Sequence, residues 1–271
     1  MSQVSDTSDA NGAAPSSSLS APERQELIID LAMANRRVDV GDLARRLGVT
    51  TETIRRDLGL LQDRKLLRRV HGGAVPWQRW RHEPSLTVRD SQNAEEKHRI
   101  AKRALEELPA EGSMIIDSGS TSAHFASLLP EDKELTVVTN SIPVVQVLAT
   151  SEAIDVIMIG GALKKNTMAL VDSSGVETVG SMVVDIAILG TDGVSAQHGF
   201  TTPYRDEVAI KRAMMSAARR TVLLTDHSKI GNDQLHRFAW VNEVDTVITG
   251  SEASESDFEE LRALCPLVIR A

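Results

Sequence analysis

Six short runs of apolar residues, which alternate with stretches of helical spacing, constrain the fold of this chain more than any other feature. The runs are rich in Val, Ile and Thr and lie at 113–117, 135–139, 154–161, 185–190, 221–226 and 245–249. Stretches with a helical pattern accompany them, at 94–108, 120–129, 142–150, 206–219 and 256–264. Continuous apolar strands that alternate with amphipathic helices predict an α/β domain with a buried, mainly parallel sheet and helices on both faces. We expect this domain to span residues 93–271.

Polar residues follow most of the runs, at or near the points where the strands are expected to end. The candidate ligand-binding residues among them are Asp117, Ser118, Gly119, Ser120, Thr121, Thr139, Asn140, Ser141, Gly160, Gly161, Asp192, Gly193, Thr201, Glu207, Lys211, Asp226 and Lys229. Each turn taken singly is a weak signal, because Gly, Ser, Asp and Asn follow strands for reasons of turn chemistry alone. Five such turns at one edge of a sheet, where α/β proteins bind ligands, predict a pocket.

The turn 117–121 has the composition of a phosphate-binding loop. Its glycine permits a tight turn, and its N–H groups and hydroxyls can hold a phosphate against the positive end of the helix that follows. Asp117 would repel a phosphate, so we expect it to accept hydrogen bonds from a sugar hydroxyl or to orient the loop. Lys211 and Lys229 are the candidate cations, although Lys211, four residues after Glu207, is also placed for a simple surface ion pair. Hydroxyls, amides, lysines and carboxylates together suit a phosphorylated polyol.

Charge divides the chain into two parts. The formal net charge is −8, yet residues 21–82 hold 13 Lys and Arg against 8 Asp and Glu, a net of +5. Residues 1–20 contribute −2, which leaves −11 for residues 83–271. A small basic domain joined to a larger acidic one suggests that the first meets a polyanion. The sign changes near a proline-containing stretch, so we expect a linker at 77–92. Residues 1–20, rich in Ser, Ala, Asn and Asp, are expected to form a disordered tail.

The basic part, residues 21–76, has the pattern of a winged helix-turn-helix domain. A first helix begins near Pro22, in a position where the first helical turn tolerates proline. A second helix follows Asp39, a good N-cap, and Gly48 ends it. Thr50 can cap the third helix. Two helices joined by a short turn that contains glycine form the helix-turn-helix arrangement, whose second helix lies in the major groove of DNA.

The third helix is expected to present a basic face to DNA. Its buried stripe is Ile54, Leu58 and Leu61, which follow one another at helical spacing. Arg55 and Arg56 fall on the opposite side, where they can read guanine edges or hold phosphates. Gly59 costs about 1 kcal/mol relative to alanine inside a helix, but on this side it lets the backbone approach the duplex. The alternative is an ordinary solvated face, on which Arg56 pairs with Glu52 one turn earlier.

The segment LLRRVHGGAV, residues 66–75, predicts a β-hairpin that would form the wing. Arg68 and Arg69 are neighbours in a strand, so they point to opposite faces and one of them can reach a phosphate. We interpret His71 as a turn residue that can touch the phosphate backbone. The candidate DNA-binding residues are Thr50, Thr51, Thr53, Arg55, Arg56, Arg68, Arg69 and His71.

The segment VDVGDLARRLGVTTETIRRDLGLLQDRKLLRRVHGGAV, residues 38–75, resembles the N-terminal signature of the DeoR-type (DeoR/GlpR family) regulators of bacterial sugar metabolism. The motifs DSGST, TNS, LGTDGV, GFTT, DEVAIKRAM and LLTDHSK resemble the effector-binding domain of that family. The resemblance implies a C-terminal fold similar to ribose-5-phosphate isomerase and the coenzyme A transferases. It also implies a repressor of a carbohydrate-utilisation operon that a phosphorylated sugar releases from its operator. Lys65, Gly59 and Asp172 depart from the family pattern and could alter the choice of operator or effector.

An enzyme is the competing interpretation, because the resemblance extends to an isomerase fold. Five of the candidate pocket residues could transfer protons: Asp192, Glu207, Asp226, Lys211 and Lys229. An isomerase has no use for an attached helix-turn-helix, so we expect no catalytic residues, no cofactor and no metal. The expected partners are double-stranded operator DNA, a phosphorylated sugar and further copies of the chain in a homodimer or homotetramer.

The expected location is the bacterial cytoplasm, on the nucleoid when the protein is bound to DNA. No stretch approaches the roughly 18 apolar residues that a membrane helix needs, so no membrane partner is expected. The N-terminal stretch has neither the basic start nor the apolar centre of a signal peptide. Cys265 is the single cysteine of the sequence, which excludes a disulfide within the chain.

Overall fold

The computed structural model describes residues 19–64, 66–76, 85–109 and 111–271. The chain divides into two compact units, Met1–Trp77 and Gln78–Ala271. Most of the expected tail and residues 77–84 of the expected linker lie outside the described residues. The remainder of the expected linker differs from the expectation, because helix α4 (Leu86–Ser91) occupies it and packs against α6 of the second unit. The buried side chain of Val88 provides the apolar contact that holds this segment in place.

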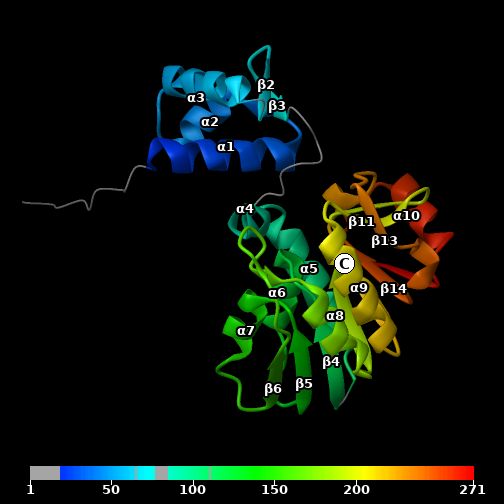
Figure 1. Ribbon diagram of the computed structural model, residues 1–271. Helices are drawn as coiled ribbons and strands as arrows, with labels where there is room; N and C mark the ends of the chain where they lie inside the picture. The colour runs from blue at the N-terminus through cyan, green and yellow to red at the C-terminus, as the bar shows by residue number, and fades with distance from the viewer. Residues whose placement is uncertain (1–18, 65, 77–84, 110) are drawn as a thin grey trace, which may run out of the picture. The chain divides into compact units, whose positions relative to one another are not determined.

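In the N-terminal unit, three helices precede a β-hairpin, as Figure 1 shows. The elements are α1 (Ala21–Asn35), β1 (Val38–Asp39), α2 (Val40–Leu47), α3 (Thr51–Asp63), β2 (Leu67–Val70) and β3 (Gly73–Pro76). The three strands form an antiparallel sheet in the order β1-β3-β2. This arrangement confirms the expected winged helix-turn-helix.

Local signals in the sequence determine where these helices begin and end. The Asp39 carboxylate accepts the N–H groups of the first turn of α2, and Gly48 ends that helix in the left-handed conformation at φ 64°. Thr50 Oγ1 accepts the Thr53 N–H at 3.2 Å and caps α3. The expected stripe of α3 is buried, with Ile54, Leu58 and Leu61 at most 1% exposed. All of these features agree with the sequence analysis.

A buried polar contact that the sequence did not indicate locks α3 onto α1. The carboxylate of Asp57 on α3 accepts hydrogen bonds from Arg24 Nε at 2.7 Å and from Gln25 Nε2 at 2.9 Å. Asp57 is only 3% exposed, so the pairing satisfies a carboxylate that would be costly to bury alone. It fixes the rotation of α3 about its own axis, and therefore the face that α3 turns to solvent.

A seven-stranded sheet forms the centre of the C-terminal unit. Its order is β15 (Leu267–Arg270), β14 (Thr246–Thr249), β12 (Thr221–Thr225), β9 (Ile186–Gly190), β4 (Gly112–Ile116), β5 (Leu135–Thr139) and β6 (Ile154–Met158). Every neighbouring pair is parallel. Each of the six expected runs forms a strand. The edge strand β15 was missed, because its four residues follow a proline and two of them are largely exposed.

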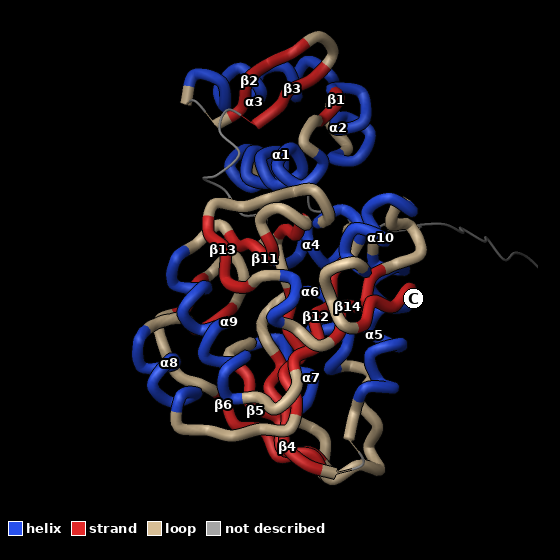
Figure 2. The backbone as a smooth tube through the Cα atoms, turned by 90° about the vertical axis from the view of Figure 1, so that its right-hand side faces the viewer, coloured by secondary structure: helices blue, strands red, loops and turns tan. Residues whose placement is uncertain are grey.

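Helices cover both faces of this sheet (Figures 1 and 2). One face packs against α5 (Ala94–Ala104), α6 (Ser120–Ala126) and α7 (Ile142–Leu148). The other face packs against α8 (Ser173–Gly180) and α9 (Arg205–Ala217), and farther along against α10 (Glu255–Arg262). Three short 3₁₀ turns complete the helical segments described: Leu105–Glu107, His227–Lys229 and Val241–Glu243. No helix in the described ranges is long and apolar enough to cross a membrane.

Two smaller sheets depart from the expected pattern. A three-stranded antiparallel sheet, β10 (Gly193–Ser195), β11 (Gly199–Thr202) and β13 (His236–Ala239), lies beside α10 over the second face. A hairpin of β7 (Leu163–Lys164) and β8 (Ala169–Leu170) precedes α8. The strands expected from the sequence do not include these segments, because strands of two to four residues are too short to show a period.

Candidate functional site

The carboxyl ends of β4, β9 and β12 open onto a pocket in the C-terminal unit. Nine of the seventeen candidate ligand-binding residues line it: Ser118, Gly119, Ser120, Thr121, Asp192, Glu207, Lys211, Asp226 and Lys229. They come from the turn after β4, the turn after β9, helix α9 and the turn after β12. The pocket therefore lies at the expected edge of the sheet, where parallel strands place their ligand sites.

A buried ion pair joins Asp117 to Lys211, and Lys211 lines the pocket. Asp117 also accepts the Gly190 N–H at 3.2 Å, and Lys211 Nζ donates to the Gly190 carbonyl at 2.9 Å. Burial by itself would lower the pKa of Lys211, but Asp117, Glu207 and Asp192 outweigh it and raise that pKa. Lys211 thus carries its charge inside the protein. Of the two roles considered for Asp117, the geometry matches the orienting one, and the interpretation of Lys211 as a surface pair is wrong.

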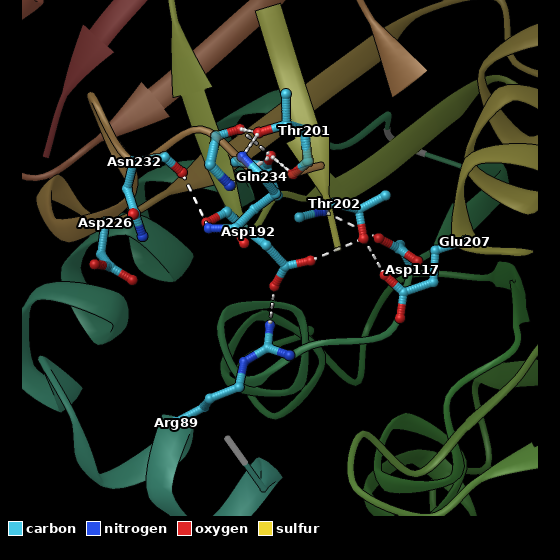
Figure 3. Close-up of polar contacts among 12 residues, drawn as sticks. Arg89, Asp117, Asp192, Thr201, Thr202, Glu207, Asp226, Asn232 and Gln234 are labelled. Carbon is cyan, nitrogen blue, oxygen red and sulfur yellow. Dashed lines mark hydrogen bonds and ion pairs between the residues drawn. The ribbon is translucent and has the colours of Figure 1, made fainter. Parts of the chain in front are cut away.

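The carboxylates of Asp192 and Glu207, which both line the pocket, meet at the hydroxyl of Thr202 (Figure 3). Thr202 Oγ1 donates to Asp192 Oδ2 at 3.1 Å and also contacts the carboxylate of Glu207. Arg89 Nη2 lies 3.2 Å from Asp192 Oδ1, and Lys164 pairs with Glu207. Burial opposes ionisation of Asp192, but Arg89, Lys229 and Lys211 outweigh it and lower its pKa. The Asp192 carboxylate is therefore a charged acceptor at neutral pH, which suits it to bind a hydroxyl group.

Lys229 supplies positive charge near the turn after β12. It makes no ion pair within 4.0 Å in the part of the chain that the structure describes. The neighbouring Asp226 accepts from Ser228 N–H at 3.0 Å and from Asn93 Nδ2 at 3.0 Å. Burial opposes ionisation of Asp226, but Lys229 and these hydrogen bonds lower its pKa. Asp226 is therefore held by the fold, while the Lys229 ammonium is available to an anionic ligand.

Eight of the seventeen candidate residues do not line the pocket. They are Asp117, Thr139, Asn140, Ser141, Gly160, Gly161, Gly193 and Thr201. Thr139 Oγ1 donates to the Ile116 carbonyl at 2.6 Å, and Ser141 caps α7. Thr201 Oγ1 donates to the Gly193 carbonyl at 3.1 Å and accepts from Gln234 N–H at 2.9 Å (Figure 3). These residues complete turns and strand pairings, which use the same side-chain chemistry as ligand binding.

Asp172, which departs from the family pattern, also lies outside the residues that line the pocket. Its carboxylate accepts the N–H groups of Ser174 and Gly175 and so caps α8, and it accepts the Ala162 N–H at 3.0 Å. These hydrogen bonds, led by that from the Ser174 hydroxyl, lower the pKa of Asp172. The residue fixes the start of a helix, so its effect on effector choice would have to be indirect.

Seven further residues line the pocket and were not singled out from the sequence. They are Arg89, Ser122, Thr167, Gly190, Thr191, Leu224 and Thr225. Gly190, Thr191 and Thr225 belong to strand-end motifs that the sequence analysis did quote. Arg89 was missed because its segment was interpreted as a linker, although Ser85 before the apolar Leu86 is a helix-start signal. Nothing in the sequence near Thr167 indicates its position.

In the N-terminal unit, the candidate DNA-binding residues lie on α3, at its start and on the wing. Arg55, Arg56, Arg68, Arg69 and His71 are exposed. The alternative considered for Arg56, a pair with Glu52, is not found among the described residues: Glu52 lies 3.7 Å from Arg55 instead. A methyl group at Gly59 would meet no atom within 4 Å, so this side of α3 is open, as expected.

The wing is held in place by backbone contacts. Arg37 Nη2 donates to the His71 carbonyl at 2.9 Å, and the Arg69 N–H donates to Gln62 Oε1 at 3.0 Å. A Cβ at Gly73 would lie 1.9 Å from the Val38 carbonyl oxygen, so β3 can pair with β1 only with glycine there. These contacts fix the wing relative to α3, and both elements carry exposed arginines.

Both units match known protein families. Residues 24–79 match the DeoR-like helix-turn-helix domain, and residues 92–251 match the DeoR C terminal sensor domain. The chain belongs to the DeoR family of DNA-binding transcriptional regulators. The family consists of regulators and not of enzymes, so the isomerase alternative has no support.

Several relatives of this DeoR-family regulator are similar over most of their length. The HTH-type transcriptional regulator GlpR of Haloferax volcanii is 36% identical over 89% of this chain and 94% of the relative. The HTH-type transcriptional repressor GlcR of Bacillus subtilis is 32% identical over 84% of this chain and 87% of its own. The glycerol-3-phosphate regulon repressor of Escherichia coli K12 is 30% identical over 84% of this chain and 90% of its own.

Among solved structures, ribose 5-phosphate isomerase A from Methanocaldococcus jannaschii is similar to part of the regulator. The match has a TM-score of 0.38 and 19% identity, and it covers 51% of this chain and 55% of that chain. The delta subunit of eIF2B from Chaetomium thermophilum matches with a TM-score of 0.42 and 14% identity, over 59% of this chain and 57% of that chain. Similarity at this level says nothing about activity.

Proposed function

We propose that this regulator represses a carbohydrate-utilisation operon and leaves its operator when a phosphorylated sugar binds the pocket of the C-terminal unit. Arg55 and Arg56 on α3 would contact the major groove, and the arginines of the wing would contact phosphates. Two relatives are named as repressors, one of them of a glycerol-3-phosphate regulon, which supports the direction of control and the class of effector.

One observation carries the choice of effector: the lining of the pocket combines two kinds of polar group. The Lys229 ammonium and the hydroxyl-rich turn Ser118–Thr121 offer charge and donors to a phosphoryl group. Asp192 and Glu207 offer carboxylate oxygens as acceptors to hydroxyl groups. A sugar that carries one phosphoryl group and several hydroxyls matches both kinds of group, whereas a neutral sugar or inorganic phosphate matches one.

The C-terminal unit would also join copies of the chain into a homodimer or homotetramer. Two reading helices must lie about 34–36 Å apart, or a multiple of that, to occupy half-sites on one face of the DNA. An effector that changes this spacing weakens binding of the operator. A coupling free energy of about 1–3 kcal/mol corresponds to a roughly 5- to 150-fold change in affinity.

The experiment is a release assay with a matched pair of variants. Binding of the full chain to its own promoter DNA is measured by fluorescence anisotropy while phosphorylated sugars are added one at a time. Ser120→Asp places a carboxylate in the pocket, so it should leave DNA binding intact and abolish release by the sugar. Ser256→Asp, on the exposed surface of α10, should behave as the wild type. If the Ser120→Asp variant is still released, the pocket is not the effector site.

A further inference from the structure

The side chain of Arg89, on helix α4, lines the pocket. The helix, Leu86–Ser91, stands in the chain between the DNA-binding unit and the first strand of the large sheet. The guanidinium lies 3.2 Å from Asp192 Oδ1, and its side chain is 12% exposed. A Cβ placed on Gly119 would lie 4.0 Å from Arg89 Nη2, so the guanidinium that pairs with Asp192 (Figure 3) is also close to the turn after β4. A group bound at that turn would therefore meet Arg89 directly.

The backbone of Arg89 is tied to the body of the unit by a second buried cation. Lys97 on α5 is 3% exposed, and its Nζ donates to the carbonyl oxygens of Arg89 and Gln92, the latter at 2.6 Å. The start of the helix is held by the Leu86 N–H, which donates to the Asn166 carbonyl at 2.7 Å. In addition to the buried Val88, polar contacts hold helix α4, and one of them, Arg89–Asp192, joins two residues that line the pocket.

Two buried hydroxyls that line the same pocket indicate that it is built for a ligand with acceptor atoms. Ser122 is fully buried and Thr167 is 3% exposed. Neither Ser122 Oγ nor Thr167 Oγ1 has a hydrogen-bond partner among the described residues. Buried hydroxyls without partners carry a cost in free energy, so such groups usually mark a position where a ligand or water completes the bonding.

We propose that Arg89 binds the phosphoryl group of the effector and thereby couples occupancy of the pocket to the position of α4. A phosphoryl group carries more charge than a carboxylate and accepts two parallel hydrogen bonds from a guanidinium, so it competes with Asp192 for Arg89. Because Arg89 belongs to the segment that continues into the DNA-binding unit, a change of partner in the pocket is transmitted along the chain. The inference rests on the proposed function, to which it adds the residue that couples binding of the effector to binding of DNA.

The test uses inorganic phosphate as the probe, with the full-length protein and chloride at matched ionic strength as the reference. Thermal stability is measured across a phosphate series for the wild type, Arg89→Gln, Arg89→Lys and Arg262→Gln, the last being exposed on α10. Charge-assisted hydrogen bonds are strong enough that Arg89→Gln should weaken phosphate about 10-fold or more. Arg89→Lys should retain part of the affinity, and Arg262→Gln all of it. Melting without phosphate shows that each variant is folded.

A second readout separates binding from coupling. Promoter DNA binding by Asp192→Asn should be weaker without phosphate, because Arg89 has lost its charged partner, and the same variant should bind phosphate more tightly, because a like charge is gone. Equal stabilisation of Arg89→Gln and wild type by phosphate would overturn the role of Arg89 while leaving the proposed function intact. If neither phosphate nor any phosphorylated sugar stabilises the wild type, both proposals fail.

Discussion

Asp117 and Lys211 form an ion pair that is almost completely withdrawn from water, with side chains 1% and 6% exposed. Removal of one partner leaves an uncompensated charge inside the protein. We expect Asp117→Asn and Lys211→Met each to lower the free energy of unfolding by about 3–5 kcal/mol. The double variant should lose less than the sum, because it leaves no unpaired charge.

Chemical denaturation of the full chain measures these losses. The control is Arg99→Met, which breaks the pair of Arg99 and Glu252, whose side chains are 41% and 42% exposed. An exposed pair of this kind contributes about 0–1 kcal/mol. Additive losses in the double variant would contradict the assignment of Asp117 and Lys211 as a single buried unit.

The glycines of the N-terminal unit offer a matched pair of substitutions. Gly73→Ala should destabilise the wing and reduce DNA binding, because the new Cβ would overlap the Val38 carbonyl oxygen at 1.9 Å. Gly59→Ala meets no atom and should stabilise α3 by about 1 kcal/mol. If the backbone at residue 59 approaches DNA, Gly59→Ala should nevertheless weaken binding. Thermal melting and anisotropy separate the two effects, and a stable Gly73→Ala variant with unchanged DNA binding would refute the account of the wing.

Arg55 is exposed on the outer face of α3, where its guanidinium lies 3.7 Å from the Glu52 carboxylate. Arg55→Ala should weaken binding of the operator by about 1–3 kcal/mol and relax the choice of base at one position, if Arg55 reads a guanine. Binding is measured against a set of operators that differ at single base pairs, with Arg262→Ala as the control. An equal loss on every sequence would instead identify Arg55 as a residue that holds a phosphate.

Lys97 makes the free energy of unfolding depend on pH in a predictable direction. Burial, as the largest cause, lowers the pKa of Lys97 to about 8, whereas an unfolded lysine has a pKa of about 10.4. Between these two values the unfolded chain binds more protons than the folded chain, so the contribution of this group to stability rises with pH. Below a pH of about 8, Lys97 is protonated in both states, so the loss of stability that its buried charge causes no longer changes with pH.

The measurement compares the free energy of unfolding of the wild type and Lys97→Met from neutral to alkaline pH. Between pH values of about 8 and 10.4, the free energy of unfolding of the wild type should rise relative to that of the variant by at most about 1.4 kcal/mol per pH unit. Parallel curves for the two proteins would show that Lys97 titrates normally in the folded state.

Local chemistry explains which parts of the structure could be predicted from the sequence. The caps at Asp39 and Thr50, the left-handed Gly48 and the six apolar strands are determined by neighbouring residues, and the structure contains all of them. Helix α8 was missed because its sequence, SSGVETVG, has two glycines and weak helix formers. Its start depends on the Asp172 cap, which the sequence analysis considered only as a change in a loop.

The pocket shows which residues of the site could not be predicted from the sequence. Polar residues follow β4, β9 and β12 and predict the turns that line the pocket. Similar residues follow β5, but they lie outside the lining, where Thr139 and Ser141 make hydrogen bonds within the fold. Arg89 and Thr167 reach the pocket from segments that lie far from these turns in the sequence. Their positions depend on tertiary packing, about which periodicity and turn chemistry carry no information.

The most direct test of the account measures binding of the full chain to its own promoter DNA at several salt concentrations, with and without a phosphorylated sugar that stabilises the protein. The account predicts that the logarithm of the affinity falls linearly with the logarithm of the salt concentration, because arginines displace counterions from phosphates. It also predicts that the sugar weakens binding roughly 5- to 150-fold. Affinity that depends on neither salt nor the sugar would contradict it.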